Sequence, residues 1–324
     1  MSRSFLTQFA WLSIAASIVT MALKAAAYYL TGSVSLLSDA VESIVNLIGG
    51  VVALTMLTIA ARPADKDHAY GHSKAEYFSS GVEGTLILIA ALSIAYTAVV
   101  RLLNPMHIHD LGMGLLVSLA ASLVNLGVAL VLSRAGRKHG SITLEANSQH
   151  LMTDVWTSAG VIVGIGIVAL TGWEVLDPVV AILVAANIIW TGWRLIHRSI
   201  DGLMDRALTA EDEKSVLQAL SAYETEGVRF HALRTRQAGA RRFVAVHVLV
   251  PGDWSVQRGH NLLERIESDI RKTLADATVF THLEPLDDPS AWADEILERA
   301  DNCGPCAPHV GPCTSEQQRP IAQQ

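Results

Sequence analysis

Six long apolar runs occupy the first 200 residues of the chain, and short polar segments separate them. Each run is long enough to cross, as a helix, a hydrocarbon layer of about 30 Å. Few charged residues interrupt the runs, so the pattern predicts membrane-spanning helices rather than the core of a soluble domain. The six predicted spans are roughly 9–30, 34–60, 78–102, 111–133, 143–171 and 175–197.

The apolar runs stop after Arg198, and a pattern typical of a soluble α+β domain begins near residue 206. Thr209 is placed as the N-cap of an amphipathic helix whose first turn is acidic. Two alternating segments then flank Gly239, which predicts a hairpin. We therefore expect the order α-β-β-α-β, with the helices on one face of a small sheet. The predicted elements are a helix at 209–223, strands at 228–238 and 241–250, a helix at 257–275 and a strand at 277–285.

Composition supports a membrane part followed by a soluble part. Of the 324 residues, 51% are hydrophobic and only 17% are charged, which is typical of an integral membrane protein. Acidic and basic residues are equal in number over the first 200 residues, so the formal net charge of −7 falls in the remainder. The chain carries no basic stripe, which argues against a nucleic-acid partner. The expected regions are a membrane domain at 1–205, a soluble domain at 206–286 and a flexible tail at 287–324.

Lysine and arginine are concentrated on one side of the predicted membrane domain. They precede the first span, fill the loops after spans two and four, and end span six, whereas the other side has only Arg101. Because cytoplasmic loops carry the excess of these residues, both termini are predicted to be cytoplasmic. Membrane lipid then surrounds the first domain, and the soluble domain faces the cytoplasm.

All three cysteines lie in the tail sequence CGPCAPHVGPC, as Cys303, Cys306 and Cys313. They therefore provide no disulfide framework for the fold. In a reducing cytoplasm such thiols, with His309 among them, are typical of metal capture. An inert tail is the alternative, and the pattern alone leaves both open.

Ionisable and amide side chains recur at helical spacing inside two of the predicted spans. Glu42 and Asn46 are four residues apart in span two, as are His150 and Asp154 in span five, so each pair shares one helix face. The two helices run in opposite directions. At about 1.5 Å per residue, Glu42 should lie level with Asp154, and Asn46 level with His150. One imidazole, two carboxylates and an amide oxygen can form a tetrahedral site for a divalent transition metal. Hydrogen bonding between helices is the alternative explanation.

A histidine in such a site also suggests a source of energy. The unperturbed pKa of histidine lies near neutral pH, and metal binding expels protons from ligands, so metal and proton would compete for the site. The sequence therefore predicts export of a divalent metal in exchange for protons, by alternating access. A divalent-cation channel and a membrane metal sensor are the alternatives without proton coupling. An intramembrane metalloprotease would need a His-Glu-x-x-His motif, and none is present.

Four ordered segments resemble the cation diffusion facilitator family, and within it the bacterial ferrous-iron/zinc efflux branch. They are GSVSLLSDAVESIVN, RPADKDHAYGHSKAE, HLMTDV and HALRTRQAG, and the resemblance extends from about residue 9 to 286. It implies a homodimer in the bacterial inner membrane, in which each protomer has six transmembrane helices and a cytoplasmic metallochaperone-like αββαβ domain. It also implies a metal/proton antiporter that carries no prosthetic group.

The resemblance assigns the transport site to Glu42, Asn46, His150 and Asp154. The pair in span two departs from the family pattern, in which aspartate or histidine is followed by aspartate. The candidate substrates are therefore Zn²⁺ and Fe²⁺, and also Co²⁺, Mn²⁺ and Ni²⁺. Asp39, one turn from Glu42, can supply the carboxylate that Asn46 lacks, or can be a hydrogen-bonded structural residue.

The resemblance implies two further sets of metal ligands. In the loop after span two they are Asp65, His68 and His72, and the spacing of the two histidines predicts that one helical turn presents both. In the soluble domain the implied positions bridge protomers, so metal bound there would strengthen a dimer. These positions are His231, His247, His260, His282 and Glu284.

Overall fold

A computed structural model describes residues 3–31, 34–103, 112–171, 173, 175–224 and 227–296. Within these ranges the description excludes the side chains of residues 3, 30–31, 34–42, 112–115, 165–166, 168–169, 177 and 293–296. The chain divides into two compact units, the first ending at Met204 and the second beginning at Asp205. Each unit is described by itself.

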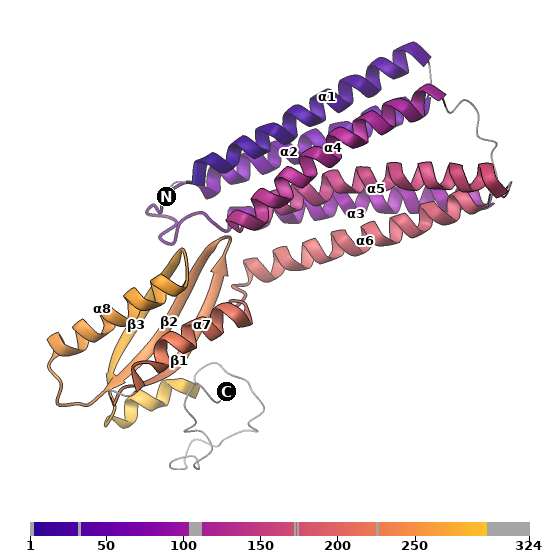
Figure 1. Cartoon of the computed structure of the whole chain (residues 1–324). Helices are drawn as coiled ribbons and strands as arrows, with labels where there is room; N and C mark the ends of the chain where they lie inside the picture. The colour runs from indigo at the N-terminus through magenta and orange to yellow at the C-terminus, as the bar shows by residue number, and fades with distance from the viewer. Residues whose placement is uncertain are drawn as a thin grey trace. The chain divides into compact units, whose positions relative to one another are not determined.

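The first unit is a bundle of long helices, preceded by a 3-10 turn, η1 (Arg3–Leu6) (Figure 1). Five of the helices contain a described stretch that is long and apolar enough to cross a membrane; α5 does not. The prediction of a six-helix bundle is confirmed over the described residues. The helices are α1 (Thr7–Thr31), α2 (Val34–Ala60), α3 (Ala75–Leu103), α4 (Gly112–His139), α5 (Ile142–Thr171) and α6 (Leu176–Leu203).

Helix α5 contacts each of the other five helices. In Figure 1, α1, α2 and α4 gather on one side of α5, while α3 and α6 lie on the other. A helix surrounded in this way can carry polar residues without exposing them to lipid. The central position of α5 therefore accounts for its polar content.

Helices α3 and α6 approach closely because two glycines face each other. A Cβ atom on Gly84 would lie 3.2 Å from the carbonyl oxygen of Gly192, and one on Gly192 would lie 3.1 Å from the carbonyl oxygen of Gly84. Small residues at such a contact let helix backbones touch, which favours packing within a membrane. Nearer the N-terminal end of α3 and the C-terminal end of α6, Ser199 Oγ donates to the carbonyl of Tyr77. The two helices are therefore held together along much of their length.

The second unit contains a three-stranded sheet in the order β1-β2-β3. Strands β1 and β2 are antiparallel and are joined through Gly239, whose φ of 61° lies in the left-handed region; β2 and β3 are parallel. The αββαβ order is confirmed. The elements are α7 (Ala210–Ser221), β1 (Arg229–Ala238), β2 (Arg241–Val250), α8 (Val256–Thr273), β3 (Ala277–Pro285) and a 3-10 helix, η3 (Pro289–Ile296).

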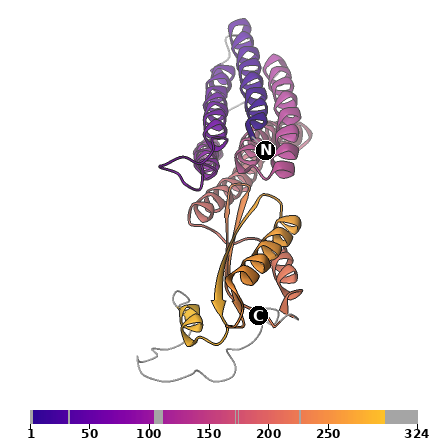
Figure 2. The same ribbon diagram turned by 90° about the vertical axis from the view of Figure 1, so that its left-hand side faces the viewer.

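The core of this unit lies between the sheet and the two helices. Figure 2 shows α7 and α8 on one face of the sheet and η3 on the other. Val244, Val246 and Val248 are buried in the core that includes residues of both helices. Because alternate residues of a strand point to opposite faces, the residues between these valines, including His247, point away from α7 and α8.

The C-terminal segment differs from expectation. A flexible tail is expected from residue 287, but residues 289–296 form η3, and the Trp292 ring lies 5.6 Å from the His231 ring. An aromatic ring packed on a buried imidazole explains why the ordered chain extends past the sheet. Cys303, Cys306 and Cys313 lie outside the described residues.

Candidate metal sites

Two residues of the predicted intramembrane site, Asn46 and Asp154, contact each other between α2 and α5, and a residue of α4 joins them. The Nδ2 of Asn46 on α2 donates to Oδ2 of Asp154 on α5. The Nδ2 of Asn125 on α4 donates to the same oxygen at 2.8 Å. Asn46 therefore contacts Asp154, one turn further along α5 than His150, the residue with which the sequence predicts it to be level. The side chains of Asp39 and Glu42 lie outside the described residues.

His150 takes a different partner, which sequence reasoning missed. Its Nδ1 lies 2.6 Å from Oε2 of Glu83 on α3, and the Glu83 side chain is completely buried. The other Glu83 oxygen accepts from Asn147 Nδ2 at 2.9 Å, and Asn147 Oδ1 accepts from Ser13 Oγ at 2.7 Å. A glutamate inside the apolar span 78–102 was the available signal, because a charge at membrane depth requires a partner.

Two amide oxygens near Asp154 have no hydrogen-bond partner among the residues that the structure describes. The Oδ1 atoms of Asn46 and Asn125 are buried, and no described group donates to either. An unsatisfied buried acceptor costs about 1–3 kcal/mol, so such atoms are rare unless something else occupies the site. Amide oxygens are good ligands for divalent cations. The Asp154 carboxylate therefore lies next to two amide groups that can also supply oxygen ligands.

A second candidate site lies in the loop between α2 and α3. Asp65, His68 and His72 bring one ligand atom each within 4.8 Å of one another. The backbone N–H of His68 donates to Asp65 Oδ1 at 2.7 Å, and with the adjacent imidazoles it holds the pKa of that carboxyl below its usual value. Asp65 is thus ready to ligate a cation at neutral pH.

The predicted helical turn in this loop is wrong. Residues 61–74 form turns and bends, and Gly71 has a φ of 81°, which a helix does not allow. The non-helical loop nevertheless brings the His68 and His72 rings together, with 4.4 Å between their centroids. His72 is fixed on its other side by the Pro63 carbonyl, 3.2 Å from Nδ1.

A third candidate site lies on the sheet face away from α7 and α8. His231, His247 and His282 are direct neighbours across β1, β2 and β3. Glu284 lies among them, with oxygens 2.8 Å from His231 Nε2, 3.1 Å from His247 Nδ1 and 3.4 Å from His282 Nε2. His231, His247 and Glu284 bring one ligand atom each within 4.8 Å of one another.

His260 does not join this cluster within one protomer. It is exposed on α8, which covers the opposite face of the sheet. Over the described ranges, the loop and the sheet provide the two groups in which three His, Cys, Asp or Glu side chains converge this closely.

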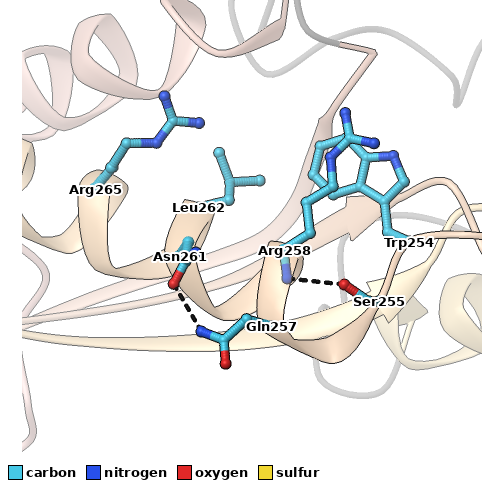
Figure 3. A pocket seen from close by; sticks show the side chains of 7 residues that line it. All are labelled: Trp254, Ser255, Gln257, Arg258, Asn261, Leu262 and Arg265. Atoms are coloured by element: carbon cyan, nitrogen blue, oxygen red, sulfur yellow. Dashed lines mark hydrogen bonds between the residues drawn. The ribbon is translucent and has the colours of Figure 1, made fainter.

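A shallow groove beside the start of α8 has a volume of about 370 Å³ (Figure 3). The Arg258 guanidinium stacks on the Trp254 ring at 3.6 Å from its centroid. None of its lining residues is a histidine, cysteine or carboxylate, so the groove is not a metal site. They are Trp254, Ser255, Gln257, Arg258, Asn261, Leu262 and Arg265.

Comparisons with known proteins match both units. Residues 10–204 match the family model "Cation efflux transmembrane domain", and residues 208–286 match "Cation efflux protein, cytoplasmic domain". An "Uncharacterized transporter" of Synechocystis is 50% identical over 93% of this chain and 95% of its own length. The "Cation-efflux pump FieF" of Shewanella oneidensis is 29% identical over 85% of this chain and 92% of its own. The protein of that name from Klebsiella pneumoniae is 28% identical over 89% of this chain and 96% of its own.

Proposed function

Because the chain belongs to the cation efflux, or cation diffusion facilitator, family, we propose that it exports a divalent transition-metal ion from the cytoplasm in exchange for protons. The chain is an integral membrane transporter, not an enzyme, and its C-terminal domain is cytoplasmic. The identity of the metal and the coupling to protons belong to the proposal. Export is supported by the Shewanella and Klebsiella relatives, which are named cation-efflux pumps.

The observation that carries the proposal is the set of unpaired acceptors at Asp154. Asp154 Oδ2 accepts from two amide N–H groups, while neither amide oxygen has a hydrogen-bond partner among the described groups. We infer that a cation stripped of water takes these acceptors, with the amides turning their oxygens toward it. The proposed ligands are Glu42, Asn46, Asn125, His150 and Asp154.

The chemistry of these ligands bears on the choice of metal. One imidazole favours Zn²⁺, Fe²⁺, Co²⁺ or Ni²⁺, whereas amide and carboxylate oxygens favour harder ions such as Mn²⁺. We therefore place the substrate in the Zn²⁺/Fe²⁺ class. We also expect the site to accept Mn²⁺ more readily than a site made only of carboxylates and imidazoles would. Since ligands must shed protons to bind metal, binding and proton movement are linked.

The other two clusters fit cytoplasmic steps. We propose that Asp65, His68 and His72 bind metal near the cytoplasmic surface. We also propose that the His231, His247, His282 and Glu284 cluster binds regulatory metal in a homodimer, in which a partner protomer can bring His260 into reach. The membrane is proposed to be the bacterial inner membrane, with both termini cytoplasmic.

Transport in proteoliposomes containing a pH dye tests the proposal. Zn²⁺, Fe²⁺, Co²⁺, Mn²⁺ and Ni²⁺ are supplied in turn to the wild type, to Asp154→Ala and to Glu145→Gln. Glu145 is a matched control, because it lies on the same helix and pairs with Arg198. We expect metal flux with opposite proton movement, lost in Asp154→Ala and kept in Glu145→Gln. Flux without proton movement would favour a channel, and flux that survives Asp154→Ala would rule out the site.

A further inference from the structure

Glu83 is a completely buried carboxylate on a membrane-spanning helix, and the proposed ligand set does not include it. We propose that Glu83 is a positioning residue for cation transport, which holds the His150 imidazole by Nδ1 and so presents Nε2 to the ion. This inference rests on the proposed function, because it concerns one ligand of the same site.

The surroundings of Glu83 are built to receive a carboxylate. Helix α2 has a glycine next to the Glu83 carboxylate, and a Cβ atom on Gly49 would lie 2.9 Å from Glu83 Oε1. Any larger residue there would displace the carboxylate. Both Glu83 oxygens have hydrogen-bond partners on α5, so this polar group is satisfied inside the membrane domain.

The directions of the hydrogen bonds set the protonation of the histidine ring. Ser13 Oγ donates to Asn147 Oδ1, so the Asn147 amide turns its Nδ2 toward Glu83. An ionised carboxylate only accepts hydrogen bonds, so Oε2 accepts one from the N–H at His150 Nδ1. In the neutral ring the lone pair then lies on Nε2, which is the form that ligates a metal.

This arrangement matches a general feature of metal-binding histidines. The ring nitrogen away from the metal usually donates to a carboxylate, which fixes the ring's orientation and makes the ligating nitrogen more basic. Glu83 provides that carboxylate from α3, whereas Asn46 and Asn125 approach Asp154 from α2 and α4. It also places a carboxylate behind the His150 ring, on a different helix from the neutral Asn46.

Glu83→Gln tests the role, because glutamine has the same size but no charge. When the side-chain oxygen of the introduced glutamine accepts from Asn147, its amide N–H₂ faces His150 and drives the ring proton to Nε2. Glu76→Gln is a matched control: Glu76 is also buried on α3, two turns earlier, and bonds Ser141 next to α5. We expect Glu83→Gln to raise the KM for Zn²⁺ by about 10- to 100-fold and Glu76→Gln to leave it unchanged.

A double variant separates positioning from general support of the fold. In a His150→Gln background the effect of Glu83→Gln on KM should disappear, since Glu83 acts through the ring. Glu83→Asp keeps the charge with a shorter reach and should give an intermediate KM; it replaces Glu83→Gln if that protein does not reconstitute. Equal KM values for Glu83→Gln and the wild type, or an undiminished effect in the His150→Gln background, would overturn the proposal.

Failure of this proposal is distinguishable from failure of the proposed function. If the wild type transports, Asp154→Ala does not, and Glu83→Gln has the wild-type KM, then only the positioning role is wrong. If Asp154→Ala transports as well as the wild type, the site itself is wrong, and the role of Glu83 is wrong with it.

Discussion

Replacing Asn125 by leucine tests whether α4 contributes to ion binding. The substitution removes the Nδ2 donor that lies 2.8 Å from Asp154, and it also removes the unsatisfied Oδ1. A hydrogen bond to a charged group contributes about 1.5–3 kcal/mol, while an unsatisfied buried acceptor costs about 1–3 kcal/mol. These two changes nearly cancel in the folded protein without ion, so the thermal midpoint in detergent should move little.

Cation binding has no such cancellation, because Asn125→Leu loses a ligand and the group that orients Asp154. A loss of about 1.5–3 kcal/mol corresponds to roughly a tenfold to hundredfold higher KM. The assay is initial flux against metal concentration in proteoliposomes, for Zn²⁺ and Mn²⁺ separately. The larger increase is expected for Mn²⁺, which depends more on oxygen ligands.

Ser122→Ala is the matched control for this variant. Ser122 lies one turn before Asn125 on α4 and bonds Ser158 of α5 at 2.6 Å, so it joins the same two helices without touching Asp154. Its KM should equal that of the wild type. An unchanged KM in Asn125→Leu, measured where Asp154→Ala abolishes flux, would refute the assignment of Asn125 to the ion site.

Three further predictions concern other parts of the chain. Glu284→Gln should remove the stabilisation that added Zn²⁺ gives to the soluble domain, seen as loss of the metal-dependent rise in its thermal midpoint; an undiminished rise would place that metal elsewhere. Gly84→Ala should destabilise the bundle by about 1–3 kcal/mol in detergent, because its Cβ would lie 2.8 Å from Ile196 Cγ1, whereas Gly127→Ala, with no atom within 4 Å, should not. The pKa of Asp269 is lowered by hydrogen bonds from Lys272 and Tyr223, so its stabilising effect is present above its ordinary pKa and is lost as the pH falls through the lowered value. Asp269→Asn should therefore lower the thermal midpoint at pH 7 and converge with the wild type in strong acid; an equal deficit at both would contradict this.

The elements of the fold follow from local patterns that the sequence displays. Apolar runs define the six helices, and Thr209 caps α7 as its position before an acidic turn predicts, accepting from the Asp212 N–H. Alternation predicts β1 and β2, and Gly239 predicts their turn. Each of these signals depends on residues that are neighbours in sequence, which is why they can be read without a structure.

Which side chains contact each other within the candidate sites depends on helix rotation and strand register. The spacing of residues in the sequence does not determine either of them. The spacing of polar residues in spans two and five does not show that Glu83 of α3 pairs with His150. The alignment of His231 with His247 and His282 includes an irregularity in β1, where Ala232 has a φ of 49°. A register shift of this kind cannot be read from alternation alone. In the loop, the left-handed Gly71 replaces the helical turn that the spacing of His68 and His72 suggests.

The central position of α5 divides the proposed ion site between two sets of helices. Asp154 accepts hydrogen bonds from amides of α2 and α4, whereas the His150 ring is hydrogen-bonded to α3. Helix α3 in turn packs on α6 through paired glycines. A shear between these sets would pull the imidazole and the carboxylate apart along α5. Conversely, a bound ion that is ligated by both residues would hold the two sets of helices together. The transported ion would therefore oppose the same shear that releases it.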